Sequence, residues 1–208
     1  MPPRQTLTRA DVIKAARAIV ESEGIGNLSM RKLSATLGTA VTSIYWHIGN
    51  RDALLDALIE EEMNEWKQIK PIGATPHARV VSVARVLRER LLTGRNIIEL
   101  VAERGMIFDI FVPTYEVLAG EFLAAGLDEE RAAMAVRTVQ FHVVGSVILQ
   151  RRAERDPAHP VDPVTSLGTS DQEVAAARVT SAALAIPAEE AFEAATALLA
   201  QGLLYPIR

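Results

Sequence analysis

Three large rings stand side by side at Tyr45, Trp46 and His47 in the stretch TAVTSIYWHIGN, residues 39–50. Successive residues of a helix point about 100° apart, so these rings cannot all face a protein core. The outward rings, with the hydroxyl groups of Thr42 and Ser43 just before them, can donate hydrogen bonds and pack on planar partners. Base edges and phosphate oxygens of a duplex are such partners, so this stretch is a candidate nucleic-acid contact.

Two short predicted helices must position these side chains. Ser29 caps a helix over 30–37 that Gly38 ends, and a second helix follows over 41–47. A helix, a tight turn and a second helix make the helix-turn-helix layout. The apolar residues expected in the seam between the helices are Leu33, Leu37, Ile44 and Ile48. The opposite face of the second helix then points into solvent.

Helix signals continue along the whole chain, and no segment keeps the alternation of a strand. Thr8 with Asp11 forms a capping box, Asn50 caps a long connecting helix, and Thr75-Pro76 opens a further helix. The predicted helices are about 9–23, 30–37, 41–47, 51–66, 75–92, 97–103, 107–125, 128–152, 170 onward and 187–201. A proline-rich loop is expected over 156–169. The fold is therefore predicted to be all-α, with a three-helix head over 1–51 and a helical body over 52–208.

Charge is distributed unevenly between these two domains. Residues 1–51 hold seven Lys and Arg against three acidic residues, whereas the remainder holds fifteen against 23. A basic head on an acidic body suggests that the head meets a polyanion, although chance alone can produce such a difference. The chain has no cysteine, no run of 18 apolar residues and no signal-peptide pattern, so we expect no disulfide, no membrane span and a cytoplasmic location.

The stretch LSMRKLSATLG…SIYWHIGNRDALLDAL, within residues 28–58, resembles the DNA-binding head of TetR-family transcription regulators. The matching positions are Gly24, Leu28-Ser29, Gly38, the Tyr45-x-His47 pair, Arg51 and Leu54. The Tyr-Trp-His triplet followed by Asn50 resembles the tetracycline-repressor branch most. The resemblance implies a ligand-responsive regulator, expected to be a repressor, that binds a palindromic DNA operator as a homodimer.

By this resemblance, one set of side chains reads bases and another contacts the phosphates of the DNA backbone. Arg31, Thr42, Ser43 and Trp46 correspond to base readers, and Ser29, Tyr45, His47 and Arg51 to phosphate contacts. Thr39, Val41 and Thr42 depart from the branch pattern, which predicts a different operator sequence with Val41 packing on a thymine methyl. The alternatives are that Tyr45, Trp46 or His47 belongs to the core, or that Arg51 is only a solvated charge.

Two apolar helices of the body are candidates for the dimer interface. The helix over 128–152 is apolar nearly all round and must be covered on several sides. With the helix after Pro187 it can form a four-helix interface between two chains, as the resemblance implies; a monomeric core helix is the alternative. The expected interface residues are Val136, Val143, Val144, Val147, Ala191, Ala195, Leu198 and Leu199.

The resemblance also implies a small-molecule pocket in each body, lined by apolar and aromatic side chains with a few polar groups. The candidates are Met63, Trp66, Lys67, Arg88, Leu91, Met106, Ile107, Ile110, Phe111, Tyr115, Gln140, Phe141 and His142. The tetracycline branch holds its drug and metal with histidines, but Lys67 and Leu100-Val101 stand at the corresponding places. We therefore expect an apolar effector with a carbonyl or hydroxyl group, no metal and no cofactor.

The hypothesis for release is that a ligand in the body tilts the connecting helix over 50–67 and separates the two heads. The competing hypothesis is an all-α enzyme or carrier that uses His142 with Glu103, Asp109 or Glu116 as acid or base. No nucleophile–base spacing supports catalysis, so we expect the chain not to be an enzyme. A scaffold that binds only protein is the remaining alternative.

Overall fold

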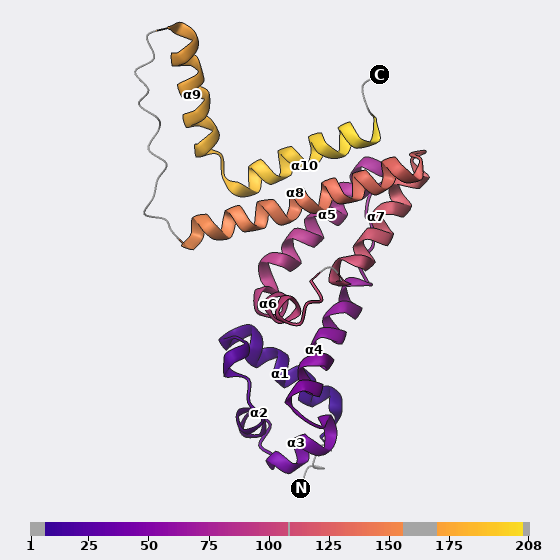
Figure 1. The fold of residues 1–208 in the computed structure, drawn as a ribbon, viewed down its shortest axis with the longest axis vertical. Helices are drawn as coiled ribbons and strands as arrows, with labels where there is room; N and C mark the ends of the chain where they lie inside the picture. Colours follow the sequence, from indigo (N-terminus) through magenta and orange to yellow (C-terminus); the bar gives the residue numbers. More distant parts are fainter. Residues whose placement is uncertain (1–6, 108, 156–169, 206–208) are drawn as a thin grey trace. The chain divides into compact units, whose positions relative to one another are not determined.

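The structure, a computed structural model, describes residues 7–107, 109–155 and 170–205, and these are helical with no strand (Figure 1). The predicted all-α class is confirmed. The loop expected over 156–169 lies outside the described residues. The chain forms two compact units, unit 1 (Met1–Lys70 and Glu89–Val117) and unit 2 (Pro71–Arg88 and Leu118–Arg208). The predicted division at residues 51 and 52 into functional domains stays a prediction.

The head opens unit 1 with α1 (Arg9–Glu23), α2 (Met30–Thr36) and α3 (Val41–Ile48). The Thr8 hydroxyl accepts from the Asp11 amide at 3.2 Å and the Asp11 carboxylate accepts from the Thr8 amide at 3.0 Å, which confirms the capping box. The hydroxyl of Ser29 caps α2 by accepting from the Lys32 amide at 3.2 Å. A 3-10 turn, η1 (Ile25–Asn27), joins α1 to α2 and was not predicted.

The head has an apolar centre that fixes which face of α3 points outward. Leu33 of α2 and Ile44 of α3 are fully buried, Ile48 is buried and Leu37 is half-buried. Gly38 turns the chain between α2 and α3 with φ of 60°, a conformation that glycine adopts without strain. Since the apolar side of α3 is inside, its other side must face solvent.

Further helices complete unit 1. These are α4 (Arg51–Trp66), α6 (Arg95–Glu103), η2 (Asp109–Phe111), the end of α5 (Pro76–Thr93) and the start of α7 (Val112–Ala124). The Asn50 side-chain oxygen caps α4 by accepting from the Ala53 amide at 2.8 Å. The prediction of one continuous helix over 107–125 is wrong at its start, because the 3-10 turn comes first. Pro113 is the second residue of α7, a place where a missing backbone N–H leaves no hydrogen bond unmade.

Unit 2 holds the first part of α5, the second part of α7, and α8 (Glu129–Arg155), α9 (Asp171–Ala185) and α10 (Ala188–Leu204). Helices α8 and α10 pack side by side (Figure 1). By length and composition α8 is apolar enough to cross a membrane, but core helices of soluble proteins meet the same criterion. Its buried side chains include Ala132, Val136, Val139, Val143 and Val147. Packing inside unit 2 therefore accounts for much of its apolar character.

Candidate nucleic-acid interface

The outer face of α3 carries the neighbouring rings of Tyr45, Trp46 and His47. Trp46 is 81% exposed and Tyr45 48% exposed, while Val41, Ser43 and His47 are half-exposed. The rings of Trp46 and His47 meet edge to face with centroids 4.7 Å apart. A core role for Trp46 is therefore excluded. A large indole that is left mostly in water is an unusual feature that points to binding.

Three predicted polar contacts flank α3. Arg31 near the start of α2 and Arg51 at the start of α4 are both exposed. The Arg51 Nε lies 3.5 Å from the carbonyl oxygen of Leu28, which leaves the outer guanidinium nitrogens available to an anion. Ser29 is exposed, and since its oxygen already accepts the capping hydrogen bond, its own hydroxyl hydrogen can point to a phosphate.

The remaining members of the predicted set are Thr39, half-exposed in the turn, and Thr42, exposed on α3. All ten predicted side chains thus belong to the helix-turn-helix segment and the first residue of α4, and none is buried. Helix α3, eight residues long with one apolar side held inside, has dimensions that fit the major groove of a duplex. The individual contacts with bases and phosphates stay predictions.

Residues 12–58 match the family model described as bacterial regulatory proteins, tetR family. Residues 73–205 match the model described as the tetracyclin repressor-like C-terminal domain. The chain belongs to the TetR family. It is a ligand-responsive transcriptional regulator with an N-terminal helix-turn-helix, as the sequence resemblance implied.

Similar proteins and structures agree with this TetR-family membership. The tetracycline repressor protein class G of Vibrio anguillarum is 30% identical over 166 residues, which cover 77% of each chain. A helix-turn-helix transcriptional repressor of Mycobacterium tuberculosis is 27% identical over 188 residues, 78% of this chain and 69% of that protein. Apo ActR from Streptomyces coelicolor matches with a TM-score of 0.65 at 25% identity, over 98% of this chain and 96% of ActR. ActR has also been solved in complex with actinorhodin.

Part of the predicted ligand set gathers in unit 1 of this regulator. Met63, Lys67 and Met106 line a cavity of about 370 Å³ whose other walls are Asp56, Ile59, Glu60 and Asn64. Trp66, Phe111 and Tyr115 form a row of rings with centroid separations of 5.5 Å and 6.2 Å. Leu91 and Ile110 are buried and Ile107 is half-buried in the same unit. The cavity is large enough for a small organic molecule.

Four other predicted ligand residues lie in unit 2. Arg88 is buried, bonds to Glu189 and, at 2.5 Å, to Gln150, and lies 4.5 Å above the ring of Phe192. Among the described residues, its buried Nε has no hydrogen-bond partner. Gln140 is buried and accepts from Arg137 at 2.6 Å, whereas Phe141 is 65% exposed. A buried N–H that lacks an acceptor is costly, so Arg88 has an unused donor to offer.

His142 in unit 2 stacks on Phe192 with centroids 5.2 Å apart and shares a hydrogen bond of 2.9 Å with the Thr196 hydroxyl. Burial lowers the pKa of His142, and the positive charge of Arg88 lowers it further. A neutral imidazole that is bonded to a hydroxyl, rather than to a carboxylate, lacks the partner that the acid–base hypothesis requires. Its geometry therefore gives no support to an enzyme.

The predicted dimer residues divide into buried and exposed groups. Val136, Val143 and Val147 are buried within a single chain, where α8 packs on α10. Val144 and Leu199 are half-buried, and Ala191, Ala195 and Leu198 are exposed. Exposed apolar side chains outside the predicted interface set follow α8 at intervals of seven residues, namely Met134, Phe141 and Ile148. This spacing places them on one side of the helix, and it could have been recognised in the sequence.

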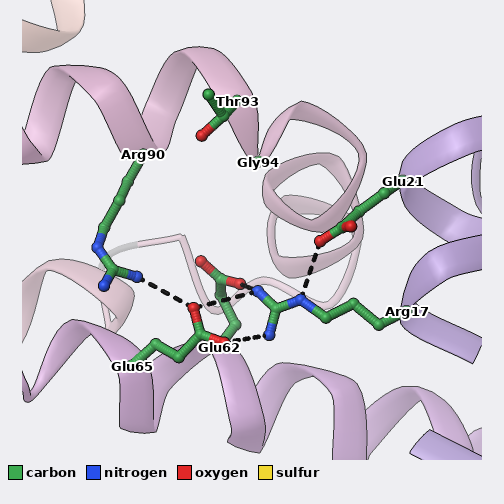
Figure 2. Close-up of a pocket in the computed structure, with 7 residues that line it drawn as sticks. All are labelled: Arg17, Glu21, Glu62, Glu65, Arg90, Thr93 and Gly94. Atoms are coloured by element: carbon green, nitrogen blue, oxygen red, sulfur yellow. Dashed lines mark hydrogen bonds and ion pairs between the residues drawn. The ribbon is translucent and has the colours of Figure 1, made fainter. Parts of the chain in front are cut away.

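A charged network in unit 1 was also missed by the sequence prediction (Figure 2). Arg17 of α1 bonds to Glu21, and to Glu62 and Glu65 of α4. Burial opposes the charge on Arg17, but the neighbouring carboxylates outweigh it and raise the pKa of the guanidinium. The available signal was the position of Glu62, midway between Leu58 and Trp66 on the inward side of α4, where a carboxylate is unexpected.

Proposed function

We propose that this regulator represses transcription by binding a palindromic operator as a homodimer in the cytoplasm, and that a small-molecule effector releases it. The observation that carries the proposal is the 81% exposure of Trp46 on a helix whose opposite side, Ile44 and Ile48, is buried. Thr42 and Ser43 precede it, and Arg31 and Arg51 flank it. These residue types suit a surface that reads bases and binds phosphates, which supports the proposal.

Two copies are needed because one recognition helix contacts too few base pairs to be selective. The exposed apolar side chains of α8 and α10, including Phe141, Ile148 and Leu198, supply a surface that a second copy would cover. A twofold pair presents two α3 helices to half-sites about one helical turn, or a multiple of it, apart. The operator is therefore expected to be a palindrome.

The proposed effector is an apolar molecule with a carbonyl or hydroxyl group. The cavity in unit 1 is lined by Ile59, Met63 and Met106, and the Lys67 ammonium in its lining can donate to a carbonyl or hydroxyl oxygen. Binding of actinorhodin by ActR is a precedent for a small-molecule ligand in a similar fold. An effector that tilts α4 would lower DNA affinity by a coupling energy of about 1–3 kcal/mol.

The test begins with selection of a bound sequence from a random duplex library. We expect a palindrome bound by two chains. Trp46→Ala should cost about 1–3 kcal/mol on that duplex and relax the preference at particular base pairs, because a base contact is lost. Arg51→Ala should weaken binding to selected and random duplexes alike and reduce the salt dependence, because a phosphate contact is lost.

The bound duplex is then challenged with actinorhodin, with apolar carbonyl compounds and with tetracycline plus magnesium. A compound that saturates one site per chain should release the duplex, and tetracycline with magnesium should not. The proposal would be contradicted if the wild type bound random and selected duplexes equally well. It would also be contradicted if no compound that saturates the protein released the duplex.

A further inference from the structure

Glu62 is a buried carboxylate whose partners come from two helices of unit 1. It is 3% exposed and lies on α4, one turn after Leu58 and one turn before Trp66. The Trp66 Nε1 donates to its Oε1 at 2.8 Å, and a guanidinium nitrogen of Arg17 on α1 donates to its Oε2. A buried carboxylate requires both charge compensation and hydrogen bonds, and here Arg17 provides the charge.

Arg17 uses all three of its guanidinium nitrogens, and two of them join α1 to α4. Its Nε donates to Glu21 on its own helix at 2.9 Å, and its Nη1 donates to Glu65 at 2.6 Å (Figure 2). The remaining nitrogen, Nη2, is the one that contacts Glu62. Glu62 and Glu65 are one helical turn apart, so a single planar group contacts two successive turns of α4.

The network also reaches the end of α5 that belongs to unit 1. Arg90 Nη1 donates to Glu65 Oε2 at 3.2 Å, so Glu65 is shared by two guanidinium groups. The network borders a cavity of about 350 Å³ that Thr93 and Gly94 also line (Figure 2). Open space on one side means that side-chain packing there does not hold these helices in place.

Apolar contacts between α1 and α4 bring the two helices together but resist sliding and rotation only weakly, because dispersion forces have no fixed direction. A planar guanidinium has its donors in a rigid fork, so its hydrogen bonds to two carboxylates depend on how those carboxylates are arranged. Arg17 therefore fixes the register of α1 on α4. Helix α1 in turn packs on α2 and α3, so this register also sets the direction of the recognition helix.

We propose that Arg17 is a positioning residue for operator recognition, which acts through Glu62 and Glu65 and contacts no DNA itself. The inference rests on the proposed DNA-binding function. Loss of the Arg17 guanidinium should leave the phosphate-binding groups of the head in place. The recognition helix α3 of each of the two chains should then lose its fixed direction. Selective binding should therefore suffer more than binding to random duplex.

The test compares Arg17→Gln, Glu62→Gln, the double variant and Lys14→Gln on selected and random duplexes. Lys14 is the matched control, because it is an exposed cation one turn earlier on α1. We expect Arg17→Gln to weaken selected-duplex binding about tenfold with random-duplex binding nearly unchanged, and to have a much smaller effect in the Glu62→Gln background. Lys14→Gln should change both duplexes alike.

Folding of each variant is followed by circular dichroism, so that affinity is compared between folded proteins. If Arg17→Gln does not fold, Arg17→Lys keeps the charge without the fork and is expected to show the same selective loss. The inference is overturned if Arg17→Gln loses the same affinity for selected and random duplexes. It is also overturned if Arg17→Gln has the same effect with Glu62 present as in the Glu62→Gln background. A wild type that binds selected and random duplexes equally overturns the proposed function, and the inference with it.

Discussion

At the residue scale, one apolar side chain is exposed to water and one charged side chain is buried. Trp46 is a large ring in water, and Glu62 is a carboxylate in the core of unit 1. An exposed Leu or a buried Val carries little information, because each is ordinary. The partner proposed for Trp46 lies outside the chain, whereas the partners of Glu62 lie inside it. The same reasoning applies to His142, a titratable ring that is half-buried in unit 2.

The pKa of His142 is lowered below 6.5 in the folded protein, so as the pH falls through 6.5 the unfolded chain takes up the proton first. Wild-type protein should therefore lose stability as the pH falls below 6.5. In His142→Gln this loss should be smaller, because an amide can keep the bond to Thr196 without titrating.

The measurement is the melting temperature of both proteins from pH 7.5 down to about pH 5. Other titrating groups are present in both proteins and cancel in the difference. Parallel curves for wild type and variant would show that His142 does not titrate differently in the folded state.

At the element scale, the starts of helices with a side-chain cap are set by local chemistry and therefore agree with the sequence prediction. Thr8, Ser29, Asn50 and Thr75 each accept a backbone N–H in the first turn of the helix that follows. The cap at Asn50 matters most for function, because α4 begins with Arg51 and also carries Glu62 and Glu65. A frayed first turn would release the predicted phosphate contact.

Asn50→Ala should therefore lower the free energy of unfolding by about 1 kcal/mol, since the Ala53 amide loses its acceptor. For a chain of this length the corresponding fall in melting temperature is about 2–4 °C. Asn50→Asp is the control, because an aspartate can accept the same hydrogen bond and favours a helix N-terminus. The cap would be unimportant if both substitutions lowered the melting temperature equally.

At the scale of the whole molecule, exposed apolar side chains remain after the chain has folded. Leu198 on α10 and Phe141 on α8 are exposed, although the helices that carry them pack on each other. A regulator that reads a palindrome needs a twofold partner, and this apolar surface in unit 2 is the candidate for contact with it.

Leu198→Glu should convert the proposed dimer to a monomer, because two carboxylates would meet near the twofold axis in a low-dielectric contact. The control is Ile72→Glu, since Ile72 is 73% exposed and Leu198 is 74% exposed, and Ile72 lies outside α8 and α10. Light scattering after size-exclusion chromatography gives the mass of each protein. A Leu198→Glu protein that keeps the dimer mass, or a monomeric Ile72→Glu protein, would rule out this interface.

The sequence by itself determined the all-α class, the helix caps and the outward face of α3. These follow from contacts within one or two helical turns, as with Asn50 and Ala53 or with Ile44 and Ile48. It also predicted most helix bounds. The start of α7 at Val112 was missed because the preceding 3-10 turn has no distinct local pattern. Family membership followed from a motif of the same local kind.

Only the tertiary structure decided which charges meet. Arg17 and Glu62 are separated by 45 positions, and no local sequence pattern around either residue predicts that they pair. It also decided that Val136 and Val143 are buried within one chain while Phe141 is left outside, since an apolar helix does not reveal which neighbour will cover each side. Long-range pairing depends on how helices pack, and packing is a property of the whole chain rather than of any one segment of it.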